Sequence, residues 1–380
     1  MQTQSKRIDF SGQNFYCGID THKKSWAVTI ETDDIVLKTF SQDPEPELLV
    51  NHLRKNYPGG NFTAGYEAGY FGYGIQRQLE SMGINCVVLH PADIPTSDKD
   101  RDQKRDPRDS RKIAKAIKNH DVSPIWVPPV SLEQDRQLLR TREKLSRDKT
   151  RIKNRIKAFL QIYGIKYPLT FSQPGSHWSA RFIKWLETVQ LNESTGTEAL
   201  RSLVRCLRFQ RGEILTVSKQ IRKLSQNDRY EQQYLRLIKK PGIGMITAMT
   251  ILTETGDVHR FKNADHYRAF FGIVPRAHDS GDKEHPGKIT KRANAHLRYL
   301  LVEITWTAIR YNPYYLNIYK SYRQRMKENK ALVRTAGKLT NEIFYCLLNS
   351  IDKCKIIFTK IFIQRFFWRF KTEGFSGSIV

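Results

Sequence analysis

Four acidic residues stand where a carboxylate could bind a cation. Asp20 and Glu67 each end an apolar run that is typical of a β-strand, and Asp106 and Asp109 lie three residues apart at the start of an expected helix. Burying a carboxylate costs several kcal/mol unless it is paired or bound to a metal. Asp20 is therefore either a turn residue or a cation ligand. Asp106 could equally be a helix N-cap, and Asp109 a partner of the helix dipole.

Taken together, the four acids favour a shared cation site. Residues three apart on a helix share a face, so Asp106 and Asp109 can converge. Four carboxylates in one pocket cannot all stay ionised without cations, because like charges raise one another's pKa. Two Mg²⁺ ions about 4 Å apart, or Mn²⁺ in their place, would offset that charge and activate both reacting oxygens of a phosphodiester. The pattern predicts metal-dependent chemistry on a phosphodiester.

A second chemical group is a serine far along the chain. Ser280 lies in the polar stretch 277–287, which we expect to form a loop. Asp-Ser-Gly triplets mostly form turns, so Ser280 is either a turn residue or a nucleophile activated by a base, a metal or nearby cations. The cations that could stabilise charge at phosphorus are Arg276, Lys283, Lys291 and Arg292.

The first third of the chain has the pattern of an α/β domain that would position the acids. Strands are expected at 16–19, 25–30, 34–41, 62–66 and 84–89, with helices at 46–56 and from 106 onward. Apolar, β-branched strands that alternate with helices are typical of this class. The remainder of the chain is mostly helical in pattern.

The longest expected helix runs from Leu132 to Leu160. Its apolar residues recur every seven positions, at Leu138, Leu145, Ile152 and Phe159, and the rest is strongly basic. Such a helix could form a coiled-coil arm, lie along a phosphate backbone, or simply present a solvated face. The residues that we assign to nucleic-acid binding here are Arg151, Lys153 and Arg155.

The segment 237–248 contains Lys-Lys-Pro-Gly-Ile-Gly and resembles a helix-hairpin-helix. Glycines at a helix N-terminus let backbone N–H groups approach a phosphate, whereas an ordinary tight turn between helices is the alternative. The candidate nucleic-acid contacts are Lys239, Lys240, Gly242 and Gly244.

The charge balance favours a polyanionic partner. The 380 residues include 64 Lys or Arg and 38 Asp or Glu, a formal net charge of +26. With 11% aromatic residues, this composition suits nucleic acid better than a membrane surface. The five cysteines show no spacing typical of zinc sites or disulfide frameworks. No apolar run is long enough to span a bilayer and no signal-peptide core is present, so we expect a cytoplasmic, nucleoid-associated prokaryotic protein without a membrane partner.

Six motifs together resemble the bridge-RNA-guided transposases of the IS110 insertion-sequence type. They are GIDTHKKSW, YEAGYFG, KRDPRDSRKIA, KKPGIG, FFGIVPRAHDSG and GKITKRANAHLR, and the resemblance covers most of residues 15–160 and 235–310.

The resemblance implies an RNase H-like (RuvC-like) DEDD nuclease domain over 1–130, a helical coiled-coil region over 131–235 and a C-terminal serine transposase domain over 236–380. It implies that Asp20, Glu67, Asp106 and Asp109 bind the metal and that Ser280 joins covalently to DNA. It also implies donor and target double-stranded DNA, a structured guide RNA and a homo-oligomer, a dimer or tetramer, as partners.

Two other functions fit the same residues. A metal-dependent junction or flap endonuclease would use the acids alone, with Ser280 as a turn residue. A non-catalytic RNA-packaging protein would use only the basic surface, and its activity would survive removal of Asp20 and Glu67.

Overall fold

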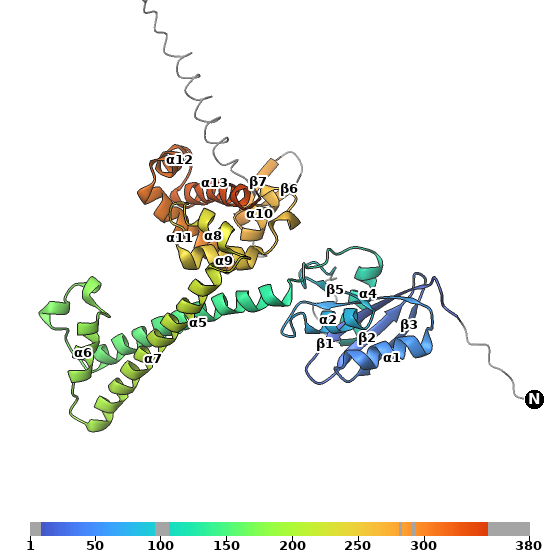
Figure 1. Cartoon of the computed structure of the whole chain (residues 1–380), viewed down its shortest axis with the longest axis horizontal. Helices are drawn as coiled ribbons and strands as arrows, with labels where there is room; N and C mark the ends of the chain where they lie inside the picture. Colours follow the sequence, from blue (N-terminus) through green and yellow to red (C-terminus); the bar gives the residue numbers. More distant parts are fainter. Residues whose placement is uncertain (1–8, 96–105, 281–282, 290–292, 349–380) are drawn as a thin grey trace, which may run out of the picture. The chain divides into compact units, whose positions relative to one another are not determined.

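The computed structural model describes residues 9–95, 106–280, 283–289 and 293–348, and side chains are described for all of these except 106–107, 275–280 and 283–289 (Figure 1). The chain divides into two compact units, Met1–Pro128 and Pro129–Val380. None of the described helices is long and apolar enough to cross a membrane.

The first unit is built on a five-stranded sheet in the order β3-β2-β1-β4-β5. Strands β1, β2 and β3 are antiparallel neighbours, and β4 and β5 run parallel to β1. The strands are β1 (Asn14–Thr21), β2 (Trp26–Glu31), β3 (Val36–Gln42), β4 (Asn61–Glu67) and β5 (Asn85–Leu89). The expected strands are confirmed, and β1, with Phe15, Cys17 and Ile19 fully buried, is the central one.

Helices cover both faces of this sheet. Helices α1 (Pro46–Asn56) and α2 (Gly74–Ser81) bury Leu49, Leu53, Ile75 and Leu79 in a core with Phe15, Ile19 and Tyr66. On the other face, Ile113 and Ile117 of α4 (Asp106–Lys118) pack with Leu89 and Ile94. This alternation of strands and covering helices confirms the expected α/β class.

The second unit is mostly helical, as the pattern predicted. Its helices are α5 (Val130–Ile162), η1 (Leu169–Phe171), η2 (Pro174–Ser176), α6 (Ala180–Thr188), α7 (Ser194–Ser225), α8 (Glu231–Leu237), α9 (Met245–Thr255), η3 (Val258–Arg260), α10 (Ala264–Phe271), α11 (Ala295–Tyr311), α12 (Pro313–Arg323) and α13 (Glu328–Leu348). Two strands, β6 (Pro275–Ser280) and β7 (Lys283–Ile289), form an antiparallel hairpin between α10 and α11.

Two expectations about the second unit need correction. The stretch 277–287 is part of the β6–β7 hairpin, not a polar loop, because the two segments pair with each other through their backbones. In α5 the buried residues are Leu132, Leu139, Ile156 and Leu160, whereas the residues of the expected seven-residue seam are half-buried. A single seam does not form because α5 packs on α9 near its start and on α6 and α7 near its end.

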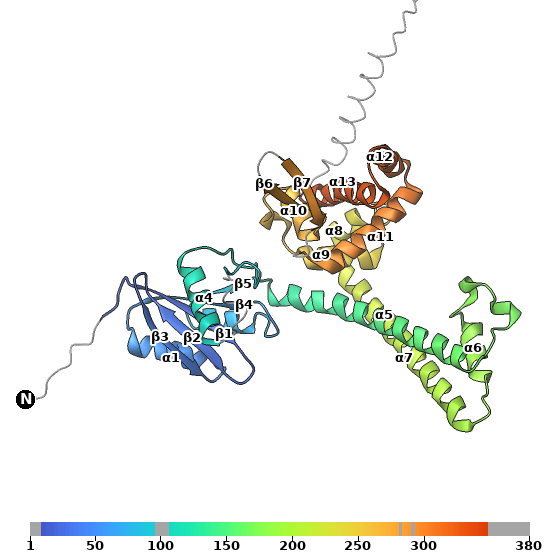
Figure 2. The same ribbon diagram turned by 180° about the vertical axis from the view of Figure 1, so that it is seen from behind.

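Helices α5 and α7 pack against each other and cross at an angle, with α6 near the end of the pair that is away from α9 (Figures 1 and 2). Ile156 and Leu160 of α5 pack there with Phe182 of α6 and Leu200 of α7. Trp178, just before α6, has φ 67°. The left-handed region costs a bulky residue about 1–3 kcal/mol.

Candidate active site

Asp20 and Glu67 lie on neighbouring parallel strands. β1 and β4 pair in parallel register, with Gly18 beside Gly65 and Ile19 beside Tyr66. Asp20 and Glu67 each come one residue later, so the register brings them side by side where the two strands end. Carboxyl ends of parallel strands are the usual place for a site in such sheets.

Two glycines show which face of the sheet the acids occupy. A Cβ atom on Gly18 would lie 2.0 Å from the carbonyl oxygen of Ser110 in α4, and one on Gly65 would lie 2.5 Å from Cδ1 of Ile117. Residues two apart on a strand face the same side. Asp20 and Glu67 therefore face the side of the sheet that α4 covers.

The direction of α4 brings its first turn to the same edge. Ser110 packs over Gly18 and its Oγ is 2.8 Å from Oγ1 of Thr29. At the other end of the helix, Lys118 pairs with Glu31, which stands opposite Tyr16 near the start of β1. Helix α4 thus runs back along β1, and its N-terminus lies at the strand ends, where the helix dipole favours negative charge.

This arrangement brings Asp20, Glu67 and the first turn of α4 to one edge of the sheet. Asp109 lies in that turn and its Oδ1 accepts a hydrogen bond of 3.0 Å from Nζ of Lys112. Asp106 begins α4, and its side chain lies outside the described residues. Asp20 contacts His22, with Oδ2 and Nε2 3.3 Å apart. Among the side chains that the structure describes, no group of three acids, histidines or cysteines is close enough to hold a metal ion.

Ser280 is the last residue of β6 and pairs with Lys283, the first residue of β7. It stands at the tip of the hairpin. The side chains of Ser280, Arg276 and Lys283 lie outside the described part, and so do residues Lys291 and Arg292 altogether.

Both ends of the segment that carries this hairpin are held together. Gly272 ends α10 with φ 69°, and a Cβ there would lie 2.3 Å from Cβ of Ala293. Nη1 of Arg298 donates to the Gly272 carbonyl oxygen at 3.2 Å. The hairpin therefore leaves and returns to the helical body at one place.

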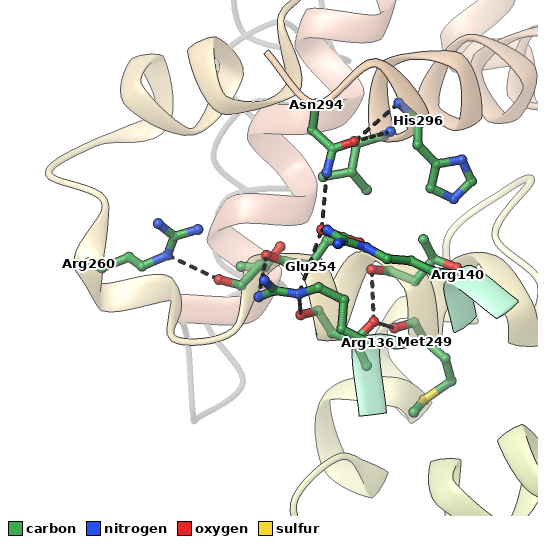
Figure 3. A network of polar contacts seen from close by, with 11 residues as sticks. Arg136, Arg140, Met249, Glu254, Arg260, Asn294 and His296 are labelled. Carbon is green, nitrogen blue, oxygen red and sulfur yellow. Dashed lines mark hydrogen bonds and ion pairs between the residues drawn. The ribbon is translucent and has the colours of Figure 1, made fainter. Parts of the chain in front are cut away.

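A buried acid, Glu254, connects the start of α11, which follows the hairpin segment, to α5 (Figure 3). Its side chain is 4% exposed and accepts two hydrogen bonds from Arg140, of 2.8 and 3.0 Å. Nδ2 of Asn294 donates to the same carboxylate at 3.0 Å, while its Oδ1 accepts from the backbone N–H groups of His296 and Leu297 and so caps α11. Glu254 thus joins α5, α9 and α11 just after the hairpin.

Arg136 completes the network. Its Nε donates to the Thr253 carbonyl oxygen at 3.0 Å and lies 3.7 Å from the Glu254 carboxylate. A buried charge is stable only when it is paired and hydrogen-bonded. The network meets that requirement and fixes the start of α5 on α9 (Figure 3).

The predicted phosphate-binding turn between α8 and α9 has structural contacts of its own. Gly242 has φ 81°, and a Cβ there would lie 2.7 Å from the Ile304 carbonyl oxygen in α11. Nζ of Lys240 lies 3.3 Å from Oε2 of Glu342 in α13. Lys239 and Gly244 are exposed, and Gly244 is the N-cap of α9. Packing on α11 therefore accounts for Gly242, while Lys239 and Gly244 are open to a ligand.

The three cations assigned on α5 differ in their surroundings. Arg151 is exposed and pairs with Asp148 at 2.8 Å, and Arg155 is exposed. Lys153 is half-buried, with Nζ 5.1 Å from the centre of the Trp178 ring.

Comparison with known proteins gives two family matches that together cover most of the chain. A model described as "Transposase IS116/IS110/IS902 family" matches residues 234–320, and the DEDD transposase model of the IS110 group matches residues 17–165. The chain belongs to the IS110/IS116/IS902 transposase family. The matched ranges include Asp20, Glu67, Asp109 and Ser280 of this family member.

Relatives from several bacteria are similar to this IS110-family chain. A protein of Sinorhizobium fredii named as transposase y4qE is 29% identical over 269 residues, which are 71% of this chain and 63% of the relative. The transposase for insertion sequence element IS1533 of Leptospira borgpetersenii is 26% identical over 77% of this chain and 84% of its own length. The transposase for insertion sequence element IS1111A of Coxiella burnetii is 28% identical over 60% of both chains.

Sequence reasoning about this family member missed Glu254 and its arginines. One signal could have found Glu254: it is the only charged residue in the apolar helix MITAMTILTET. A charge in that position must be exposed or paired. Its partners, Arg136 and Arg140, lie more than a hundred positions earlier, and no local pattern indicates the pairing.

Proposed function

We propose that this chain is an insertion-sequence transposase that cuts and exchanges DNA strands with Mg²⁺ or Mn²⁺ and a serine nucleophile. The observation that carries the proposal is the position of Asp20 beside Glu67 at the edge of the sheet where α4 begins. The sheet order and the covering helix support an RNase H-like (RuvC-like) domain at 1–130. We assign the coiled-coil region to 131–235 and the serine transposase domain to 236–380.

The donor set fits a divalent cation. Asp20 and Glu67 offer carboxylate oxygens on one face of adjacent strands, and Asp109 lies in the first turn of α4 beside Asp106. Oxygen ligands of this kind suit Mg²⁺ and Mn²⁺. When bound, the metal would offset the negative charge of these carboxylates and activate the oxygens of the scissile phosphate.

Ser280 supplies the covalent step in this proposal. Its Oγ attacks the phosphorus and loses its proton to a base, and a new O–P bond forms. The bond between phosphorus and the 3′ oxygen of the cut strand breaks, and the departing oxygen takes a proton from water to become a 3′-hydroxyl. The resulting 5′-phosphoserine ester keeps the bond energy that rejoining requires. We expect the acids and Ser280 to come from different protomers of an oligomer, and a structured guide RNA to choose the DNA.

Trapping the protein on DNA tests the serine step. The full chain, with its copurified RNA and Mg²⁺, is incubated with end-labelled DNA and separated under denaturing conditions. We expect a covalent adduct with the unaltered protein and with Ser321→Ala, an exposed serine of α12, and none with Ser280→Ala. If Ser280→Ala forms the adduct as well, the serine mechanism is wrong.

The same assay separates the rival functions. Metal-dependent cutting that persists in Ser280→Ala without any adduct would support a junction or flap endonuclease. Cutting that is unchanged after ribonuclease treatment would rule out guidance by RNA.

A further inference from the structure

Four half-buried cations face one another where α5 packs on α7. They are Arg142, Lys149 and Lys153 of α5 and Arg211 of α7, and we name them the arm cluster. The three α5 residues are spaced by seven and four positions, so they lie along one side of the helix. Nε of Arg142 donates to Oγ of Ser218 at 2.8 Å, which fixes the cluster against α7.

The arm cluster holds positive charge without acidic partners. Burial lowers the pKa of Lys149, and the charges of Arg142 and Arg211 lower it further. The pKa of Lys153 is lowered by burial and by Lys149 and Arg211. Within the described part of the chain, no carboxylate lies within ion-pair distance of these four cations.

The acids nearest in sequence on α5 are engaged elsewhere. Asp148 pairs with Arg151, and Glu143 pairs with Arg147 and lies 3.0 Å from Nδ1 of His296. Like charges that are half-buried together destabilise the folded chain. A ligand that brings negative charge would remove this cost.

Trp178 stands beside the cluster in a strained conformation. Its φ of 67° is rare for a bulky residue. Nη1 of Arg211 donates to its carbonyl oxygen at 3.1 Å, and Nζ of Lys153 lies 5.1 Å from the ring centre. Two members of the arm cluster thus contact one half-buried tryptophan, and strained residues of this kind gather at binding sites.

We propose that the arm cluster and Trp178 bind an unpaired stretch of nucleic acid, whose phosphates lie on the cations and one of whose bases stacks on the indole ring. Phosphates supply the missing negative charge. An aromatic ring beside a cationic groove is the arrangement that single-stranded binding sites use. Bases in a duplex are already stacked, so Trp178 favours an unpaired strand.

This site adds a partner contact to the proposed function, and its test needs neither cleavage nor Ser280. The full chain, stripped of copurified nucleic acid at high salt and kept with a metal chelator, is titrated into fluorescent unstructured RNA, the equivalent single-stranded DNA, and a duplex. The fluorescence anisotropy of the labelled nucleic acid is measured at several salt concentrations. The strand type that binds more tightly identifies the source of the ligand.

The key comparison is between two double variants that lose the same charge. Lys149→Gln with Lys153→Gln should weaken single-strand binding more than tenfold and reduce the salt slope by about 1.4, or about 0.7 for each lost phosphate contact. Lys144→Gln with Lys219→Gln removes two exposed cations of α5 and α7 and should change binding little. Equal weakening by the two pairs would overturn the proposal.

Two further measurements exclude a purely structural explanation. Lys149→Gln should raise the melting temperature, because it removes like-charge repulsion, so weaker binding cannot come from unfolding. Trp178→Asn keeps a residue that tolerates positive φ and should weaken single-strand binding about tenfold while leaving duplex binding unchanged. A lower melting temperature for Lys149→Gln, or unchanged single-strand binding for Trp178→Asn, would contradict the assignment.

Discussion

The carbonyl oxygen of Ser110 occupies the space that a side chain on Gly18 would need, 2.0 Å from the position of its Cβ atom. The backbone N of Ala114 lies 2.4 Å from the same position. Helix α4 therefore rests directly on the backbone of β1. This contact sets how far along β1 the helix sits, and hence which of its residues reach the strand ends beside Asp20.

Gly18→Ala should displace α4 and destabilise the first unit. An added methyl group with no space to enter costs about 1–3 kcal/mol, and here the atoms in the way are backbone. We expect a lower free energy of unfolding in denaturant titrations and a loss of DNA cutting larger than the stability change explains. Gly74→Ala in α2, where no atom lies within 4 Å of the added Cβ, should leave both unchanged. Equal effects of the two variants would show that the close contact is unimportant.

Asp20→Asn and Glu67→Gln should each stop metal-dependent DNA cutting while the fold is kept. Removing a metal ligand should lower the cutting rate about 100-fold or more. The melting temperature should stay the same or rise, since each change removes one of two adjacent negative charges. Cutting is measured against Mg²⁺ and Mn²⁺ concentration, with the exposed Asp43→Asn as the control. Full cutting by both variants would mean that Asp20 and Glu67 do not hold the catalytic metal.

Glu254→Gln should destabilise the second unit strongly. Without its carboxylate, Arg136 and Arg140 lose the anion that compensates them, and breaking a buried ion pair costs about 3–5 kcal/mol. The readout is the urea midpoint of the full chain. Glu198→Gln breaks an exposed pair with Arg205 and should leave the midpoint nearly unchanged. A midpoint for Glu254→Gln that matches this control would mean that the network contributes little.

Stability should fall in alkaline solution because of two buried thiols. Burial raises the pKa of Cys17, and that of Cys86, from 9.0 to about 12. Below pH 9 the thiols of Cys17 and Cys86 stay protonated in both the folded and the unfolded chain. Between pH 9 and 12 the unfolded chain loses them while the folded chain keeps them, so the free energy of unfolding falls, by up to about 1.4 kcal/mol per pH unit for each thiol.

Urea titrations at about pH 8 and about pH 10 measure this fall. Cys17→Ala with Cys86→Ala should reduce the difference between the two conditions. Cys206→Ala, which removes an exposed thiol, should leave it unchanged. A pH dependence that is the same in all three proteins would contradict the role of the buried thiols.

The fold was predictable where periodicity and local chemistry determine the element. The strands of the first unit follow from short runs of apolar, β-branched and aromatic residues, and the start of α1 follows from Pro46. The hairpin of β6 and β7 was not predictable from the sequence. Its strands contain two prolines and mostly polar residues, and only their pairing with each other makes them strands. The buried positions of α5 were also missed, since different stretches of one helix pack on different neighbours.

The same division applies to the candidate sites. Asp20 and Glu67 lie at the ends of their strands, so their meeting at one edge follows from parallel pairing. The arm cluster has no such signal, because Arg211 is far from Lys149 in the sequence and only the packing of α7 on α5 brings them together. Trp178 is an ordinary tryptophan in the sequence, and its backbone conformation appears only in the structure.

Because Ser110 of α4 rests on Gly18 of β1, the position of Asp109 relative to Asp20 and Glu67 depends on the number of residues between Asp109 and Ser110. One residue inserted between Asp109 and Ser110 would swing Asp109 about 100° around the helix axis, away from the strand ends, while the rest of α4 stayed in place. Substitutions far from this contact leave the spacing intact. Length changes within the first turn of the helix move Asp109 relative to Asp20 and Glu67, so the number of residues between Asp109 and Ser110 matters as much as their identity.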